Sequence, residues 1–526
     1  MGMGYLCVVL HAHLPFVRHP ETPGPHRDDW FLEALVECYI PLLHILHRLV
    51  KDDVPFRLTL SVSPSLLSMF LDPFLQRRAW EHLEGLVELG EKELVRTRNT
   101  PQVQAVARMY RDRFSEAREF FIGEWRSDAV ACIQSLVEHG RIELITTAAT
   151  HGFLPGLKTN PNAVRAQIMV ALDLYEKVFG GRPQGFWLPE CGYYPGLEAE
   201  LEREGLRYFF VDAQAILRSR PRAKYGVHAP VYTGLGVAAF ARDPDASEQV
   251  WSSRVGYPGD HDYREYYRDI GYELDLGYIG PYLTRDGARK DTGYKYCRVT
   301  GPGEKKEVYV REWALKKAAM HSRHFLQSSI DKACAMSHWV ERKPISVAPF
   351  DAELFGHWWF EGPEWLDYLI RQTVFDQEAI ELVTPADYLD QYPTNQVVEL
   401  SPSTWGRGSD STVWVGSNND YIYRHLKWGG EKMKELANQQ SVNGGVPGRA
   451  KAQAARELLL AQSSDWAFMM ADDNTAEYGH RRFRTHMLNF IGLYRQIRTD
   501  SCDERWLSRL EATDNLFPYI DLTHFK

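Results

Sequence analysis

Closely spaced cysteines, a basic leader and long apolar runs are all missing from this sequence, and each absence excludes something. The seven cysteines are an odd number, lie far apart and include no CxxC, which is typical of reduced thiols rather than of a disulfide framework. The N-terminus runs directly into an apolar, strand-like segment with no basic region before it. No apolar run approaches about 20 residues, the length that a transmembrane helix needs. We therefore expect a cytoplasmic protein that has no membrane partner.

An excess of positive charge is missing as well. Lys and Arg number 61 against 70 Asp and Glu, for a formal net charge of −9, which disfavours nucleic acid as a partner. Neither HExxH nor CxxC occurs, so the commonest zinc motifs are absent. The composition is 44% hydrophobic and 25% charged over 526 residues, which is ordinary for a globular protein with a large core. We expect a neutral ligand, no cofactor and no obligate protein partner.

Short apolar runs alternate with amphipathic helices up to about residue 395. The predicted strands are residues 5–10, 56–62, 142–147, 185–189, 208–211, 345–350 and 379–383, and the predicted helices between them are 31–49, 76–89, 102–139 with interruptions, and 162–178. This alternation is typical of a parallel α/β sheet. About seven such units suit a barrel or an incomplete barrel.

The pattern divides the chain into three parts. Residues 1–248 and 345–395 are predicted to form the catalytic barrel, and residues 249–344 an insertion of helices and loops over its mouth. Strand signals disappear after residue 396, and helices are expected at 421–440, 448–463, 475–498 and 503–514. Residues 396–526 are therefore predicted to be an all-α domain that completes the substrate cleft.

Two apolar strands end on a carboxylate that is surrounded by aromatic residues. Glu190 lies in GFWLPECGY and Asp351 in VAPFDAELFGHWWF. Two carboxylates in one cleft provide the nucleophile and the general acid/base that cleavage of a glycosidic bond needs. Glu353 is a weaker candidate for the role of Asp351, and Asp351 alone can also cap the following helix.

Polar residues follow several other predicted strands in the same phase. His11 and His13 follow the first strand, His151 the third and Asp212 the fifth. In a parallel barrel these positions meet at the carboxyl ends of the strands. The two histidines of HAH either contact sugar hydroxyls, have a structural role, or bind a metal with Asp212 as the best third ligand; we favour sugar contact and no metal.

Further candidates for substrate contact are aromatic or charged residues outside the strands. Trp405 and Trp414 lie in a Gly/Ser-rich stretch and are either a stacking platform for a glucan or packing residues. Trp30 precedes a helix, Asp465 lies at a helix break where caps are common, and Arg264 lies in the insertion. For Arg264 a solvated ion pair competes with contact to sugar hydroxyls.

Five segments together resemble glycoside hydrolase family 57, and within it the 1,4-α-glucan branching enzymes. They are HAHLPF at 11–16, ELITTAATHGFLP at 143–155, GFWLPECGYYPGLE at 185–198, APFDAELFGHWW at 348–359 and SSDWAFMMADDNTAEYGHRR at 463–482. The resemblance implies an incomplete (β/α)7 barrel with a C-terminal helical domain. It implies that Glu190 is the nucleophile, that Asp351 is the acid/base, and that a further tryptophan of the insertion lines the cleft. It also implies that the following residues line the cleft: His11, His13, His151, Trp405, Trp414 and Asp465.

The resemblance also points to a mobile loop after Pro230 that favours transfer over hydrolysis. Our candidate is the loop at 231–249, with Gly234 and Gly236 as hinges and Tyr232 shielding the anomeric carbon. The function expected is chain transfer to a glucan 6-hydroxyl with retention. The alternatives are an α-amylase or 4-α-glucanotransferase with the same residues, a metal-dependent deacetylase or mannosidase, and a non-catalytic glucan-binding protein.

Overall fold

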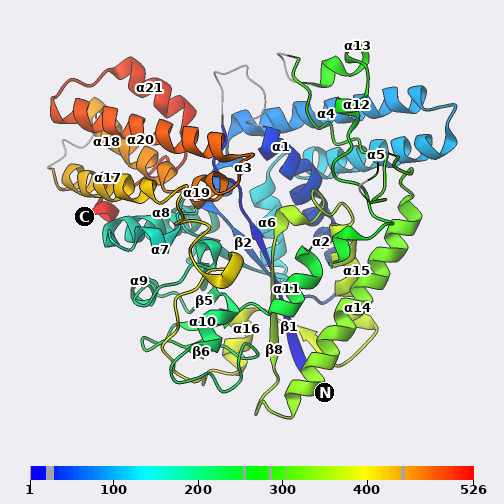
Figure 1. Cartoon of the computed structure of the whole chain (residues 1–526), viewed down its shortest axis with the longest axis horizontal. Helices are drawn as coiled ribbons and strands as arrows, with labels where there is room; N and C mark the ends of the chain where they lie inside the picture. Colours follow the sequence, from blue (N-terminus) through cyan, green and yellow to red (C-terminus); the bar gives the residue numbers. More distant parts are fainter. Residues whose placement is uncertain are drawn as a thin grey trace.

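A curved sheet of mostly parallel strands forms the centre of the protein, and helices surround it (Figure 1). The computed structural model describes residues 2–18, 29–252, 256–283, 287–301, 303, 305–439 and 445–526. The strands are β1 (Gly4–Ala12), β2 (Leu58–Val62), β3 (Ile142–Thr147), β4 (Gly185–Trp187), β5 (Tyr208–Val211), β6 (Val231–Tyr232), β7 (Ala238–Ala241), β8 (Ile345–Asp351) and β9 (Ile380–Leu382).

The sheet has the order β6-β7-β5-β4-β3-β2-β1-β8, with β9 beside β1. Among the described strands, every pairing is parallel except that of β6 with β7. The amide of Asp243, just after β7, donates to the carbonyl of Val347 in β8 at 2.7 Å, so the two ends of the curved sheet meet. The predicted incomplete (β/α)7 barrel is confirmed.

Strand β7 corrects the prediction made from the sequence. Residues 238–241 were expected in a loop, but they pair with β5 and are buried. The run AAFA has no β-branched residue and is short, so it gives little strand signal. Its small side chains fit a strand whose two faces are both covered.

Several helices of the barrel start at recognisable caps. Asp72, Asp128 and Asn160 each accept a backbone N–H of the first helical turn, and proline follows directly in two of these helices. The helices of the barrel and insertion are α1 (Asp29–Ala34), α2 (Ile40–Lys51), α3 (Pro64–Phe70), α4 (Pro73–Arg96), α5 (Pro101–Arg118), α6 (Ala129–Glu138), α7 (Leu154–Leu157), α8 (Pro161–Phe179), α9 (Glu198–Arg203), α10 (Ala213–Leu217), α11 (Pro244–Trp251), α12 (Ile270–Glu273), α13 (Leu276–Ile279), α14 (Arg311–Ser337), α15 (Gly362–Phe375) and α16 (Pro385–Gln391).

Among the described residues, one helical stretch, Trp30–Lys51, is long and apolar enough by length and composition to cross a membrane, although no such stretch was expected from the sequence. Its most apolar window is 78% buried inside the fold, as in a core helix. It contains a π-helical turn, Leu35–Tyr39, between α1 and α2. Such turns are frequent at functional sites, and this one contacts the segment that follows β8.

The C-terminal part is helical, as predicted. Its helices are α17 (Tyr421–Asn438), α18 (Gly445–Ala461), α19 (Ser464–Met470), α20 (Ala476–Arg498) and α21 (Glu504–Thr513). In Figure 1 they gather on one side of the barrel, while α14 runs along the opposite side. Helix α19 begins beside the carboxyl ends of the strands, where Ser464 N donates to the carbonyl of His151 at 2.9 Å. The exact domain boundaries stay a prediction.

Candidate active site

A cavity of about 860 Å³ opens at the carboxyl ends of the strands. Most of the predicted site residues line it: His11, His13, Trp30, His151, Glu190, Asp351, Trp405, Trp414 and Asp465. They come from the barrel, from the connection after it and from α19. The side chains that were expected to act together are thus brought to one cavity by the fold.

Glu190 lies just after β4 in a strained turn. Its backbone has φ 61° and ψ 21°, a left-handed conformation that is uncommon for residues other than glycine. The carboxylate accepts hydrogen bonds from Trp405 Nε1 and from Ser464 Oγ, each at 2.8 Å. Burial raises the pKa of Glu190 to about 7, against the opposing effect of these two donors. The two donors hold the carboxylate and favour its charged form.

Asp351 is the last residue of β8 and lies in register beside His11, near the end of β1. Its pKa is raised well above the usual range, first by burial and then by the nearby charges of Glu353 and Glu190. When two acids share a site, the one with the lower pKa ionises first and holds the other protonated. The arrangement therefore favours an ionised Glu190 and a protonated Asp351, which suits a nucleophile and a general acid.

Glu353 also lines the cavity, but its carboxylate is already bound by the protein. Oε1 accepts from the backbone N–H of His13 at 3.1 Å and from the hydroxyl of Tyr39. Burial raises the pKa of Glu353 to about 6. Tyr39 of the π-helical turn binds this carboxylate. We therefore infer that Glu353 acts by raising the pKa of Asp351.

The three histidines form a stacked group against the strand ends. The rings of His13 and His151 have centroids 3.9 Å apart and an interplanar angle of 16°, and Nε2 of His11 lies 3.0 Å from Nε2 of His151. Burial lowers the pKa of His11 and of His151 well below the usual range. Desolvation also acts on the partly buried His13, but Asp465 outweighs it and raises the pKa of His13, while His13 in turn helps to lower the pKa of Asp465 to about 2. The group thus combines a hydrogen-bonded His13–Asp465 pair with two imidazoles whose burial favours the neutral form.

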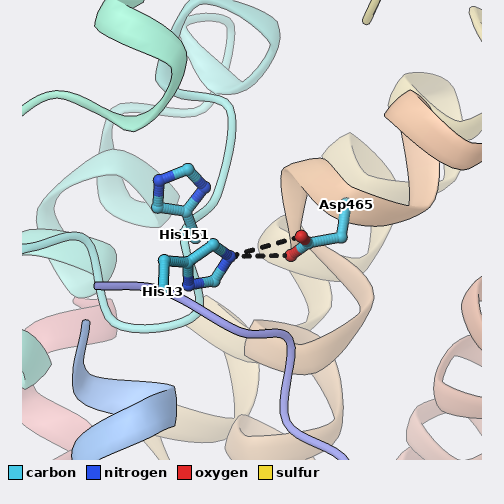
Figure 2. A group of neighbouring side chains, drawn as sticks. All are labelled: His13, His151 and Asp465. Atoms are coloured by element: carbon cyan, nitrogen blue, oxygen red, sulfur yellow. Dashed lines mark hydrogen bonds and ion pairs between the residues drawn. The ribbon is translucent and has the colours of Figure 1, made fainter. Parts of the chain in front are cut away.

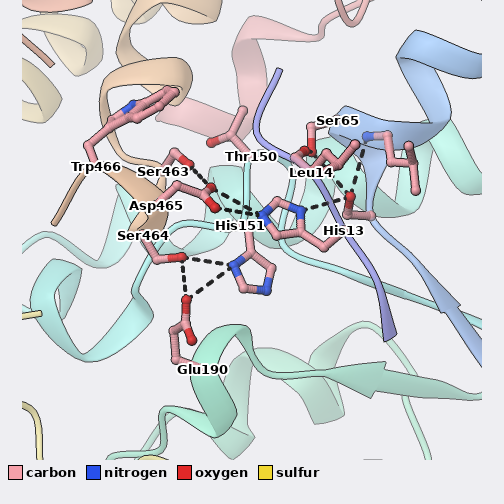
Figure 3. Close-up of polar contacts among 12 residues, drawn as sticks. His13, Leu14, Ser65, Thr150, His151, Glu190, Ser463, Ser464, Asp465 and Trp466 are labelled. Atoms are coloured by element: carbon pink, nitrogen blue, oxygen red, sulfur yellow. Dashed lines mark hydrogen bonds and ion pairs between the residues drawn. The ribbon is translucent and has the colours of Figure 1, made fainter. Parts of the chain in front are cut away.

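The C-terminal helices complete this site (Figure 3). His13 Nε2 lies 3.1 Å from Asp465 Oδ2, and Ser464 Oγ lies 2.8 Å from His151 Nδ1. Residue Ser463 also forms an isolated β-bridge with Gly152. Glu190 therefore contacts Ser464, which lies 274 positions away in the sequence.

Aromatic side chains supply apolar walls on which a sugar ring can stack. Trp30 and Trp405 line the cavity as predicted, while Trp414 is almost wholly buried and stacks on Phe153 at 5.1 Å. Trp251, in the predicted insertion, is 41% exposed, and Trp358 is 52% exposed. Trp251 lies in the predicted insertion and lines the cavity. The segment YELDLGYIG of the insertion, where the tryptophan implied by the resemblance was expected, contains none.

Several lining residues were not predicted as site residues: Arg242, Trp251, Trp358, Arg407, Phe468 and Met469. The only signal that could have found Trp358 was its position seven residues after Asp351 in an aromatic cluster. Arg242 and Arg407 gave no signal, because a lone arginine in a connecting segment is usually solvated.

The predicted substrate contact of Tyr232 is wrong. Tyr232 pairs with Ala238, which lies beside Tyr208 at the amino-terminal end of β5. Its hydroxyl donates to the carbonyl of Pro393 at 3.0 Å, so it lies at the end of the barrel opposite to the cavity. Residues 233–237 close a tight turn between β6 and β7, with Thr233 N donating to Val237 O. The first part of the predicted lid, residues 231–241, is therefore a hairpin, while Arg242 and Ser247 of its second part line the cavity.

Arg264 and Asp212 also differ from expectation. Arg264 is buried away from the cavity, and Nη2 donates to the carbonyl of His357 at 2.6 Å, so it is neither a sugar contact nor a solvated ion pair. Asp212 caps α10 and accepts from Arg242 Nε at 2.7 Å, so its carboxylate is engaged elsewhere than with the histidines. Arg264 and Asp212 therefore both stabilise protein segments near the cavity.

The barrel, the carboxylate pair and the tryptophan-lined cavity define an enzyme that acts on carbohydrate. The model of glycosyl hydrolase family 57 matches residues 7–401, and that of the 1,4-alpha-glucan branching enzyme C-terminal domain matches residues 425–525. The chain belongs to glycosyl hydrolase family 57. The family predicted from the sequence motifs is confirmed.

Three members of known name are similar to this chain over nearly its whole length. A 1,4-alpha-glucan branching enzyme from Thermococcus kodakarensis is 32% identical over 98% of this chain and 78% of its own length. The crystal structure of the alpha-amylase AmyC from Thermotoga maritima is 39% identical, with a TM-score of 0.92 and 99% of both chains covered. That of a branching enzyme from Pyrococcus horikoshii is 31% identical, with a TM-score of 0.89 and 99% and 97% covered.

Proposed function

We propose that this protein is a 1,4-α-glucan branching enzyme that works by double displacement with retention. The observation that carries the proposal is the cavity in which Glu190 and Asp351 meet among exposed tryptophans. The C-terminal helices match the branching-enzyme C-terminal domain; they supply Asp465 to the cavity and Ser464 as a hydrogen-bond donor to Glu190. A sugar ring stacks on an aromatic face and leaves its hydroxyls for polar partners.

In the first half of the reaction Glu190 attacks the anomeric carbon of an α-1,4-linked glucose. The bond from this carbon to the 4-oxygen breaks as the bond to the carboxylate oxygen forms, and Asp351 gives its proton to the departing 4-oxygen. The product is a covalent glucosyl-enzyme and a shortened glucan with a free 4-hydroxyl. The two donors on Glu190 hold the attacking oxygens in place.

In the second half Asp351, now ionised, takes the proton from the 6-hydroxyl of an acceptor glucan. The 6-oxygen attacks the anomeric carbon and the bond to Glu190 breaks, which regenerates both carboxyl groups and forms an α-1,6 branch. Because the anomeric carbon is attacked twice from opposite sides, its configuration is retained.

Hydrolysis is the second candidate, and two observations favour it. The solved structure that is 39% identical is an alpha-amylase. In addition, Tyr232, which was expected to shield the glucosyl-enzyme, lies in a hairpin at the other end of the barrel. If water reaches the intermediate, the same residues produce a new reducing end. We expect both reactions, with branching dominant when acceptor chains are abundant.

The deciding experiment is incubation with amylose, followed by debranching and chain-length analysis with reducing ends counted in parallel. Short chains released only after debranching, in excess of new reducing ends, support branching. Reducing ends without new branches would replace branching by hydrolysis. If the amylose is unchanged, the proposal that the protein is an enzyme is rejected, and the remaining alternative is a non-catalytic glucan-binding protein.

We further propose that the reaction serves glycogen-type synthesis in the cytoplasm. All seven cysteines are free, which suits a reducing compartment. Fractionation of cells that express the chain, with detection in the soluble fraction together with glucan, tests this placement; recovery from the membrane or the medium would contradict it.

A further inference from the structure

Three metal-ligating side chains meet at one wall of the cavity. His13, His151 and Asp465 each offer one ligand atom, and these atoms all lie within 4.8 Å of one another. Figure 2 shows the edge of the His13 ring pointing to the carboxylate of Asp465, with the ring of His151 beside it. The three residues come from segments that follow β1, follow β3 and begin α19.

Neighbouring hydroxyls fix the orientation of these side chains. Ser63 Oγ lies 2.9 Å from Nδ1 of His13, which leaves Nε2 aimed at Asp465. Ser463 Oγ donates to Asp465 Oδ2. In known metal sites such outer partners set the ring orientation and tautomer of ligating histidines. Both ring nitrogens of His151 have partners, Ser464 Oγ at 2.8 Å from Nδ1 and His11 Nε2 at 3.0 Å from Nε2, so an ion bound by His151 replaces one of these contacts.

The donor set is selective. Two imidazoles and one carboxylate suit Zn²⁺ and other late transition metals, while Mg²⁺ and Ca²⁺ require mainly oxygen ligands. All three residues line the cavity, so an ion held by them keeps an open position towards it. We propose that His13, His151 and Asp465 bind Zn²⁺ and that the bound ion inhibits the enzyme by occupying the substrate's place beside Glu190.

The inhibition follows from the distance to the nucleophile and rests on the proposed function. Nδ1 of His151 lies 3.7 Å from Oε1 of Glu190. A cation held beside this carboxylate attracts its negative charge and makes it a weaker nucleophile. It also occupies the side chains that we expect to contact sugar hydroxyls. Zn²⁺ and glucan therefore compete for the same site.

A second group with a similar donor set serves as an internal comparison. Glu457, His486 and Asp514 also lie close together in the C-terminal helices, but all three are buried and none of them lines the cavity. The guanidinium of Arg482 lies 3.2 Å from Nε2 of His486, and a fixed cation there disfavours a metal ion. We assign this group to packing of α18 against α20 and the segment after α21.

Direct binding to the metal-free enzyme tests the proposal without turnover. Calorimetric titration with ZnCl₂ is expected to show one ion per chain and no comparable heat with MgCl₂. Asp465→Asn is expected to weaken binding at least about tenfold, as loss of metal-site residues does. The matched control Asp514→Asn, in the buried group, is expected to leave the Zn²⁺ affinity unchanged. Circular dichroism and thermal melting establish that each variant is folded, and His13→Gln replaces Asp465→Asn if it is not.

The competing outcomes are distinct. Equal affinity in wild type and in folded Asp465→Asn overturns the site, as does loss of binding in Asp514→Asn alone. Visible absorption of Co²⁺ added to the wild-type enzyme reports imidazole ligation independently of any variant, and its absence also overturns the site. With amylose, Zn²⁺ is expected to raise KM and leave kcat unchanged, and EDTA to restore the rate. An inactive enzyme that still binds Zn²⁺ contradicts the proposed function and leaves the metal site standing.

Discussion

Removal of the Ser464 hydroxyl is expected to move the acid limb of the pH–rate profile to higher pH. Ser464 Oγ donates to Oε1 of Glu190 at 2.8 Å, and this hydrogen bond favours the ionised carboxylate. Burial is the dominant cause of the raised pKa of Glu190, and the hydrogen bond from Ser464 opposes it. In Ser464→Ala this opposing effect is lost. The pKa of Glu190, about 7 in the intact protein, therefore rises further.

The size of the shift follows from the energy of a hydrogen bond to a charged group. Such bonds contribute about 1.5–3 kcal/mol, and one pKa unit corresponds to about 1.4 kcal/mol. Trp405 Nε1 still donates to the other carboxylate oxygen at 2.8 Å, so we expect the lower end, a shift of about one unit. Below the limb, kcat/KM then falls about tenfold relative to wild type, because the fraction of ionised nucleophile falls by that factor.

The assay is kcat/KM on a soluble malto-oligosaccharide measured across pH, since this ratio reports the ionisation of the free enzyme. Ser463→Ala is the matched control, because the neighbouring hydroxyl donates to Asp465 and has no bond to Glu190. It is expected to shift the limb by much less. An acid limb that stays in place in Ser464→Ala, or moves to lower pH, would show that Ser464 does not stabilise the charged nucleophile.

Four further outcomes follow from the site. Glu190→Gln and Asp351→Asn should each lower turnover of amylose by at least about a hundredfold with the melting temperature nearly unchanged; more than a tenth of wild-type activity in either contradicts its role. Glu353→Gln removes a charge that raises the pKa of Asp351, so the alkaline limb of kcat/KM should move to lower pH, and a shift to higher pH refutes this coupling. Tyr232→Ala should leave the ratio of branches to reducing ends unchanged, because its hydroxyl contacts Pro393 at the far end of the barrel; a changed ratio would reinstate a gating role. Enzyme treated with EDTA should keep its full rate, and a loss that Zn²⁺ reverses would indicate a metal-dependent hydrolase.

Much of the barrel could be predicted because its signals are local. The runs that became β1, β2, β3, β5 and β8 were identified from apolar, β-branched and aromatic residues within short segments of the sequence. Strand β7 was missed because its alanines carry no such preference, and only pairing with β5 makes it a strand. That omission led directly to the wrong position of Tyr232, since a hairpin was taken for a lid.

The site divides in the same way. Asp351 ends strand β8 and Glu190 lies shortly after β4, so their strand-end positions could be predicted from the sequence around them. The role of Arg264 could not, because the same arginine in a Tyr-rich segment is solvated in one fold and buried against Phe360 in another. Trp251 was also hidden, since nothing near it in the sequence shows that α11 borders the cavity.

The sequence by itself determined the alternation of strands and helices, the two carboxylates at strand ends and the family motifs, because turns, caps and apolar periodicity depend on neighbours a few positions apart. The tertiary structure alone decided that Ser464 and Asp465 meet Glu190 and His13, across 274 and 452 positions of sequence. It also decided the ionisation order of the carboxylates. Burial and the distances between charges set that order, and both arise only when segments far apart in the chain pack together.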